Sequence, residues 1–392
     1  MNEKIEDIVI RNQQSFIDIT EKVNILINKE DRVKTGIKEL ERKIERYFSN
    51  FTRDNYKDTE KILKLNSLST ELLVYKKLGY DFSIAEHNVI LGLQEMICYR
   101  VEEALSYFEI YVEENRKTKL SCDVLYLCAM ICYNNANFSK AIYYFTKAAN
   151  LYLVLFGKHD FQSEIYIGEC MYLSKSREYP QEKINEYFEL IEETLDKLNN
   201  SENLDKFYLT LYLKWGNCYF QPGIKLSNNN IGSNNLSNIT INNQKALSYY
   251  KKIINFIGGF YHKEKLNDLL KVIMVYSLAQ AMYSSRKDID SSFARTNELF
   301  KHVFEKLVNL LLNKTETIIL AQFYFMLGTC SWYSFEVAAD QGLFYLENSR
   351  KQTQLIPSNI KFYSCMTKEL LTRDEFIMQI DFCINKIKSR MR

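Results

Sequence analysis

One short motif occurs twice at a fixed separation, and it constrains the fold of this 392-residue chain more than any other feature. Ala104 and Phe108 return as Ala141 and Phe145, which gives a period of 37 residues (141 − 104 and 145 − 108). A pair made of a large and a small residue precedes each copy: Leu91-Gly92 and Cys128-Ala129. Repetition at this period is typical of repeat architectures, so we read the chain first as an array of similar units.

Further large–small pairs follow along the chain. They stand at Ile167-Gly168, Trp215-Gly216, Leu278-Ala279 and Leu327-Gly328. Their downstream motifs are Ile184-xxx-Phe188, Ala246-xxx-Tyr250, a poorly matched segment at Ala294, and Gly342-xxx-Leu346. Each pair with its downstream motif predicts two helices joined as a hairpin.

The spacing has a packing reason. Small residues on both helices of a hairpin let the two backbones approach, and the aromatic residue fills the space between one hairpin and the next. A single helix pair cannot bury its apolar faces alone, so successive pairs stack. The sequence therefore predicts an all-α fold, a right-handed α-solenoid of about six hairpins with a long helical segment at its N-terminal end.

This pattern resembles the tetratricopeptide repeat family, whose order is large, Leu, Gly and aromatic in the first helix, then Ala, aromatic and Ala in the second. Residues 122–153 match it best, with Leu125, Cys128, Ala129, Ala141, Phe145 and Ala148. The resemblance covers residues 60–350, departs from the family in its longer later turns, and implies that the first helix of each pair lines a concave face.

The arrangement of segments is similar to two groups of such proteins. A heptad-patterned N-terminus before the repeats is the layout of kinesin light chains, and NLYLVLFGKHD at 150–160 is similar to a loop between their repeats. A short N-terminal helical bundle followed by six or seven repeats is the layout of Rap-type peptide receptors.

Residues 1–55 follow a different rule, because apolar residues alternate there at steps of four and three from Ile5 to Phe51. Asn12 and Glu30 interrupt this heptad seam, and Gly36 weakens the helix. A seam of this kind predicts either a coiled coil, with a homodimer formed through residues 5–51, or helices that pack against the first repeats as a cap. Both interpretations stay open at this point.

The remaining chain divides into two further segments. Residues 60–371 form the predicted superhelix, interrupted by a polar Asn-rich loop at 222–243 that we expect to be disordered. Residues 372–392 form a predicted C-terminal capping helix, opened by a capping box from Thr372 to Glu375. Its expected apolar face is Ile377, Ile380, Ile384, Ile387 and Met391.

Composition excludes several classes of protein. Only 12 Gly and 3 Pro argue against an all-β fold, and a net charge of +2 argues against a nucleic-acid partner. No apolar run is long enough for a membrane span, and no secretory signal is visible. We therefore expect a cytoplasmic protein whose nine cysteines are reduced and mostly buried.

Counting from the family pattern, groove residues fall near repeat positions 2, 5, 9, 12 and 13, with the large–small pair at positions 7 and 8. Position 12 is mostly aromatic, position 9 mostly polar, and position 5 apolar or aromatic throughout. The predicted partner-binding residues are Tyr126, Met130, Tyr133, Glu169, Tyr172, Asn217, Phe220, Tyr276, Gln280, Tyr283, Phe325 and Trp332. The alternative is that the aromatic residues form the core between helices.

Motifs for catalysis are missing: there is no phosphate-binding glycine loop, no nucleophile elbow and no paired metal-ligating histidines. We therefore expect no enzyme activity, no cofactor and no metal. The leading interpretation is an adaptor or scaffold that binds a protein or peptide segment in the groove. The alternative is a peptide-sensing regulator whose superhelix changes conformation and controls an effector bound at the N-terminal helices.

Overall fold

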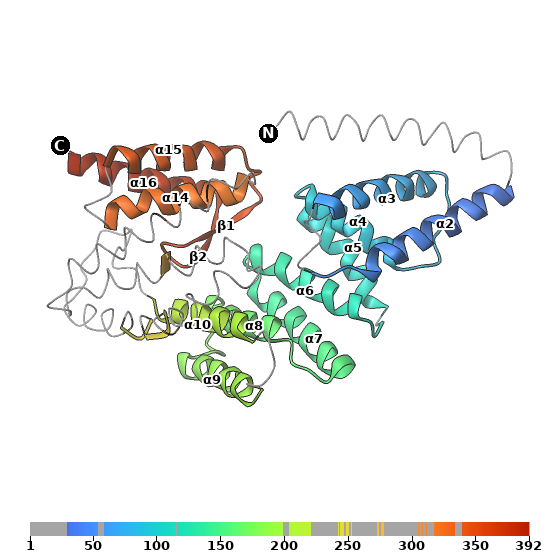
Figure 1. Ribbon diagram of the computed structural model, residues 1–392, viewed down its shortest axis with the longest axis horizontal. Coiled ribbons are helices and arrows are strands. Elements are labelled where there is room, and N and C mark those ends of the chain that lie inside the picture. The colour runs from blue at the N-terminus through green and yellow to red at the C-terminus, as the bar shows by residue number, and fades with distance from the viewer. Residues whose placement is uncertain are drawn as a thin grey trace. The chain divides into compact units, whose positions relative to one another are not determined.

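The computed structural model describes residues 30–53, 59–114, 116–198, 204–220, 317–333 and 339–391, with isolated positions between 242 and 311 (Figure 1). These residues divide into two units. Unit 1 comprises the residues up to Cys132 and the segment Tyr143–Asp160. Unit 2 comprises the segment Tyr133–Ile142 and the residues from Phe161 onward. The predictions for the seam before Glu30, and most of those for the Asn-rich loop, lie outside the described residues.

Helices with short connections make up unit 1. They are α2 (Glu30–Ser49), α3 (Thr59–Lys77), α4 (Glu86–Ile97), α5 (Val101–Glu113), α6 (Lys119–Asn134) and α7 (Phe138–Phe156), the last two without the segment Tyr133–Ile142. The connection between α4 and α5 is short enough to force the two helices into an antiparallel pair.

The described residues of unit 2 form helices and a β-hairpin. They are α8 (Phe161–Leu173), α9 (Gln181–Lys197), α10 (Asp205–Tyr219), α14 (Thr317–Tyr333), α15 (Ala339–Gln354), β1 (Lys361–Ser364), β2 (Glu369–Thr372) and α16 (Arg373–Met391). The strands pair antiparallel, with Tyr363 opposite Leu370. The all-α repeat class is confirmed, but the sequence analysis missed this hairpin.

Glycine on the first helix of a pair makes contact with the motif residue on the second. A Cβ atom on Gly92 would lie 2.4 Å from the Phe108 ring, and one on Gly168 would lie 2.6 Å from the Phe188 ring. The same relation holds between Gly216 and Tyr250 and between Gly328 and Leu346. The close helix approach expected from the repeat is therefore confirmed, and it is the packing that the tetratricopeptide resemblance implies.

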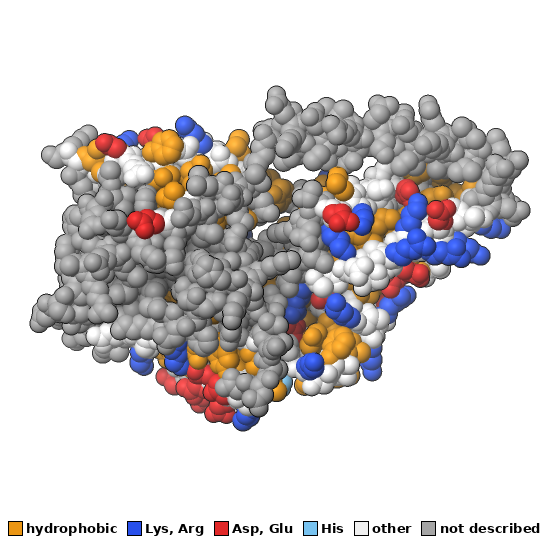
Figure 2. Space-filling model, in the orientation of Figure 1, with side chains coloured by type: hydrophobic (Ala, Val, Ile, Leu, Met, Phe, Trp, Pro, Cys, Tyr) orange, Lys and Arg blue, Asp and Glu red, His pale blue; other side chains and the backbone are white. Residues whose placement is uncertain are grey.

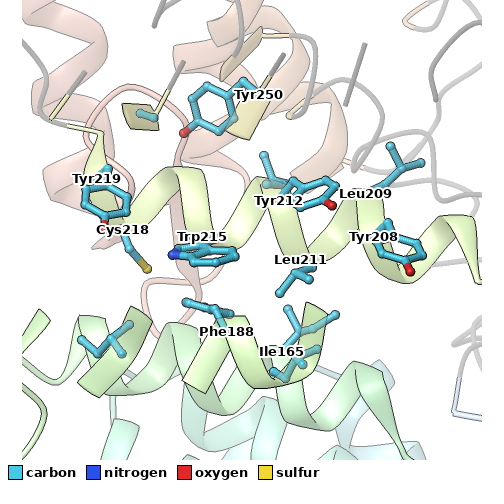
Figure 3. Packing of buried hydrophobic residues seen from close by; sticks show 14 of the residues in the cluster. Ile165, Phe188, Tyr208, Leu209, Leu211, Tyr212, Trp215, Cys218, Tyr219 and Tyr250 are labelled. Carbon is cyan, nitrogen blue, oxygen red and sulfur yellow. The ribbon is translucent and has the colours of Figure 1, made fainter. Parts of the chain in front are cut away.

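Aromatic residues also join one hairpin to the next. Phe188 of α9 stacks on Trp215 of α10 with ring centroids 5.6 Å apart, and Trp215 stacks in turn on Tyr249 at 4.3 Å. Figure 3 shows the Trp215 indole lying over Phe188 within this cluster of buried residues. Phe188 thus contacts both the glycine of its own hairpin and the first helix of the following one, as the motif predicts.

The described part of the heptad seam packs within the chain. Val33, Leu40, Ile44 and Tyr47 are buried, and α2 contacts both α3 and α4. Gly36 has a packing role beyond weakening the helix, since a Cβ atom there would lie 2.4 Å from the Tyr75 hydroxyl oxygen on α3. The capping interpretation is therefore favoured for residues 33–51, because these side chains are already covered in a single chain.

The C-terminal helix α16 begins at the predicted capping box. The Thr372 backbone N–H donates to Glu375 Oε2 at 2.7 Å, and the Glu375 N–H donates to Thr372 Oγ1 at 3.2 Å. The apolar face differs in part from the prediction, because Met391 is exposed and Ile377 is only half-buried. The buried face consists of Phe376, Ile380, Cys383, Ile384 and Ile387.

Helix α9 shows how the repeats divide core from solvent. It buries Ile184, Phe188, Ile191 and Leu195, which recur at steps of three and four. Its opposite face is acidic, and Figure 2 shows red side chains gathered at the position of this helix. The exposed acidic residues are Glu182, Glu186, Glu189, Glu193 and Asp196.

We predict that Gly168→Val lowers the free energy of unfolding by about 1–3 kcal/mol, because the added atoms overlap the Phe188 ring. Chemical denaturation followed by circular dichroism measures this change. The double variant Gly168→Val/Phe188→Leu should recover part of the loss, giving a coupling energy of about 0.5–3 kcal/mol. Additive effects of the two substitutions would contradict the contact.

Candidate functional site

A buried ion pair lies at the centre of the candidate site in unit 2. Lys214 Nζ of α10 is 2.7 Å from Glu169 Oε2 of α8, and both side chains are less than one-tenth exposed. Lys214 stands in an otherwise apolar run just before the Trp215-Gly216 pair, so the helix that packs the repeat also carries the cation inward. We call these two residues and the tyrosines around them the Glu169–Lys214 cluster.

Three tyrosine rings surround the Lys214 ammonium. Its Nζ lies 4.6 Å from the ring centroid of Tyr166, 5.7 Å from that of Tyr363 and 5.8 Å from that of Tyr133. The Tyr133 hydroxyl also donates to Glu169 Oε2 at 3.0 Å. Aromatic faces attract a desolvated cation, so the rings replace part of the hydration that Lys214 gives up.

Electrostatics keep this cluster charged. Burial alone would lower the pKa of Lys214, but the Glu169 carboxylate and Tyr166 together hold that pKa above its ordinary value. Burial, followed by the charge of Glu169, raises the pKa of Tyr133 well above its ordinary value. Near neutral pH the cluster therefore presents an ammonium beside neutral phenols that can donate hydrogen bonds.

Two amide side chains extend the cluster toward the β-hairpin, and we call Asn217 and Gln322 the amide pair. Asn217 Nδ2 donates to the Tyr363 hydroxyl at 2.8 Å, and the Tyr250 hydroxyl donates to Asn217 Oδ1 at 2.6 Å. Gln322 Nε2 of α14 donates to the backbone carbonyl oxygen of Tyr363 at 3.2 Å. The cluster therefore contacts both the side chain and the backbone of an extended strand.

The structure brings together several residues that the sequence assigned to the groove. Tyr133 and Glu169 are hydrogen-bonded to each other, and Asn217 bonds to Tyr363 in the same network. Tyr276 is buried with its hydroxyl hydrogen-bonded to that of Thr329, another position 9 residue. These four residues lie in buried polar contacts, which neither the groove nor the apolar-core interpretation fully anticipated.

Other predicted groove residues pack in cores. Tyr126 lies in unit 1 under the Arg53 guanidinium, 4.2 Å from its ring centroid, and Phe325 packs on Phe376 at 5.0 Å. The core alternative is favoured for these two, because cationic and aromatic neighbours cover their rings. Phe220 is also buried, whereas Met130 and Tyr172 are half-buried. Gln280, Tyr283 and the side chain of Trp332 lie outside the described residues.

Sequence reasoning missed four members of the site. Lys214 carried a signal, since a single lysine inside an apolar helical run needs a buried partner. Gln322 also carried one, because it stands at groove position 2 of the repeat whose pair is Leu327-Gly328. Tyr166 and Tyr363 carried none, because only the three-dimensional fold brings their rings to Lys214.

A second buried ion pair lies in unit 1. Arg53 donates through both terminal nitrogens to the two carboxylate oxygens of Asp160, at 2.7 and 2.6 Å. Asp160 is buried, at 3% exposed. This bidentate ion pair connects the segment after α7 to the segment after α2, which are far apart in the sequence. Its role is therefore structural.

Lys368, in the turn between β1 and β2, is buried in a different setting. Its Nζ donates to Ser277 Oγ at 2.6 Å and lies 5.0 Å from the ring centroid of Phe220. Burial lowers the pKa of Lys368 to about 7. The turn therefore holds a lysine that the fold favours in its neutral form.

Among the residues that the structure describes, no group of three or more His, Cys, Asp or Glu side chains could hold a metal ion. Within the same residues, none of the helices has the length and apolar character that crossing a bilayer requires. Eight of the nine cysteines are buried, as the sequence predicted, and Cys98 is exposed.

Fold and site together define a helical-repeat protein whose paired helices enclose a polar cluster. No protein-family model matches the chain, and no curated protein matches it. One similar solved structure is that of NprR in complex with its cognate peptide NprX, at 14% identity and a TM-score of 0.45, covering 98% of this chain and 99% of that chain.

A second similar structure is that of a Rap protein complexed with competence and sporulation factor. It has 10% identity and a TM-score of 0.42, and the match covers 90% of this chain and 99% of that chain. Both TM-scores are below 0.5, so neither likeness indicates a function for this chain.

We predict that Glu169→Gln destabilises the protein by about 3–5 kcal/mol, because it leaves the buried Lys214 ammonium without a counter-charge. Denaturant unfolding measures the loss. Glu193→Gln is the matched control, since its pair with Lys197 is exposed and should change stability by less than about 0.5 kcal/mol. Similar losses in both variants would contradict the importance of the buried pair.

The lowered pKa of Lys368 predicts that the free energy of unfolding depends on pH. Between pH 7 and the ordinary lysine pKa, the unfolded chain binds one proton that the folded chain does not, so stability rises with pH there. Between pH 7 and 9, we expect the free energy of unfolding of the wild type to rise by up to about 1.4 kcal/mol per pH unit relative to that of Lys368→Met. Denaturant unfolding at pH 7, 8 and 9 measures the difference, and parallel curves for the two proteins would contradict it.

Proposed function

We propose that the protein is a non-catalytic adaptor that binds an extended peptide segment of a partner protein on the surface bearing Glu169, Asn217 and Gln322. The observation that carries this proposal is the hydrogen bond from Gln322 Nε2 to the backbone carbonyl of Tyr363 in β1. A side-chain amide on the first helix of a repeat thus already binds the backbone of an extended segment.

The repeat geometry supports more than one such contact. Positions 2 and 9 are seven residues apart, or two helical turns, so they lie on the same face of a first helix. Gln322 stands at position 2 of its repeat, and Asn217 and Glu169 stand at position 9 of theirs. Amides bind a peptide backbone without regard to its sequence, whereas the charged and aromatic members of the cluster supply selectivity.

Burial adds to the strength of these contacts. Asn217, Glu169 and Gln322 are each at most 5% exposed, so a ligand reaches them only by displacing the part of the chain that covers them, which includes Tyr363. Hydrogen bonds in such surroundings are electrostatically stronger than those at the surface. Asn217 and Glu169 also have partners within the fold, which hold their side chains in place before a ligand arrives.

The proposal extends to location and assembly. A cytoplasmic location is supported by the eight buried cysteines, because reducing surroundings keep such thiols intact. A homodimer through the seam between Val33 and Phe51 is not part of the proposal, since the chain itself buries those side chains.

The test is a display selection of random linear peptides on the full chain, followed by affinity measurements on variants. We predict that Asn217→Ala/Gln322→Ala weakens the selected peptides at least about tenfold, as expected for two lost hydrogen bonds of about 1 kcal/mol each. Asn348→Ala/Gln352→Ala, with the same residue types on α15, is the matched control and should leave affinity unchanged. Selecting no peptide, or equal losses in both variants, would overturn the proposal.

A further inference from the structure

The strand β1 has two faces with different roles. Phe362 is buried and stacks on Phe376 of α16, with centroids 4.8 Å apart, and Ser364 Oγ donates to Gln379 Oε1 at 2.7 Å. Tyr363 stands between them in the strand, so its side chain leaves from the opposite face and contacts Asn217 of α10. The hairpin is therefore held in place by residues other than Tyr363.

Three kinds of contact meet at Tyr363. Asn217 Nδ2 donates to its hydroxyl, the Lys214 ammonium lies 5.7 Å from its ring centroid, and Gln322 Nε2 donates to its carbonyl oxygen. We call Lys214, Asn217 and Gln322 the Tyr363 site. Together they contact a phenol hydroxyl, an aromatic ring and an extended backbone, which are the features of a tyrosine residue in a peptide.

The Tyr363 site does not depend on Tyr363 for its own arrangement. Lys214 is neutralised by Glu169 at 2.7 Å, and Asn217 Oδ1 accepts a hydrogen bond from Tyr250 at 2.6 Å. Removing the Tyr363 ring would therefore leave neither a buried charge without a counter-ion nor the Asn217 side chain without an anchor. The site would persist in a form able to bind another tyrosine.

One atom of the site lacks a partner. Gln322 is 5% exposed, and its Oε1 accepts no hydrogen bond from any of the described residues. A buried acceptor without a donor costs about 1–3 kcal/mol. A peptide ligand could supply a backbone N–H there.

Tyr363 is also less enclosed than its neighbours. It is half-buried, whereas Phe362 beside it is fully buried. Because neighbouring side chains in a strand point to opposite faces, a change of the Tyr363 rotamer leaves the Phe362 side of the hairpin in the core. The side-chain contact that must be broken is thus the hydrogen bond between Asn217 and the Tyr363 hydroxyl.

We propose that Tyr363 occupies the site that a tyrosine of the peptide ligand takes when it binds, so that Tyr363 is a tethered competitor of that ligand. This inference rests on the function proposed above and adds the side chain that the ligand must carry. Because the competitor is part of the chain, it is always present beside the site. The apparent affinity for the ligand is the intrinsic affinity multiplied by the fraction of molecules in which Tyr363 has left the site. Binding of the peptide then rotates the Tyr363 side chain out of the site. The position of this side chain distinguishes the liganded protein from the free one.

N-acetyl-L-tyrosinamide is the probe, because it carries a phenol with peptide groups on both sides. Titration calorimetry should show that full-length Tyr363→Ala binds it at least tenfold more tightly than the wild type. N-acetyl-L-phenylalaninamide, which lacks the hydroxyl, should bind Tyr363→Ala about fivefold more weakly than the tyrosine probe. Adding Asn217→Ala should remove the difference between the two probes.

Equal affinity of wild type and Tyr363→Ala for the tyrosine probe would overturn the inference, as would no binding to a folded Tyr363→Ala protein. Should circular dichroism show that Tyr363→Ala does not fold, Tyr363→Phe decides the matter. This variant keeps the ring but loses the hydrogen bond from Asn217, so it must bind the probe more tightly than the wild type. Affinity equal to that of the wild type would overturn the inference.

The selected peptides separate this inference from the proposed function. Peptides that depend on the amide pair, contain tyrosine and bind Tyr363→Ala more tightly than the wild type support both. Peptides that depend on the amide pair but bind both proteins equally overturn the inference and leave the function standing. Finding no peptide that depends on the amide pair overturns both.

Discussion

Close contact between a glycine on one helix and a large side chain on the next is the constraint on which the structure depends. Gly168 faces Phe188, and Gly216 faces Tyr250, at separations that leave no room for a Cβ atom. Because the same contact recurs, the first helices of successive pairs present equivalent positions in a regular order. The contact that builds the repeat therefore also places Glu169 and Asn217 within one network.

The polar cluster lies where a helical repeat would ordinarily bury apolar side chains. A buried ion pair is costly to desolvate, and well-packed apolar residues of similar size are often at least as stable. Lys214 and Glu169 are tolerated because Tyr133, Tyr166 and Tyr363 contact the charges. We infer that the cluster is retained for the selectivity that a charged, aromatic and amide-bearing surface offers to a peptide.

The sequence predicted the parts of the fold that depend on local spacing. The Gly168–Phe188 contact follows from a motif that can be read directly, and so does the capping box at Thr372 and Glu375. Prediction failed for the β-hairpin, because its sequence signal is short. The β-hairpin has only four residues in each strand, and the alternation of Phe362 with Tyr363 was too short to stand out from the helical pattern.

The candidate site was predictable to a lesser extent. Repeat positions placed Glu169 and Asn217 at equivalent points of their helices because the helix period fixes which face a residue occupies, but they also assigned Tyr126 and Phe325 to a groove. Those two are buried because Arg53 and Phe376, which are distant in sequence, cover their rings. The most direct test of the account is a crystal structure of the chain bound to a selected peptide. It should show Asn217 and Gln322 hydrogen-bonded to the ligand, with the Tyr363 phenol rotated away; a ligand bound elsewhere, with both amides still on Tyr363, would contradict it.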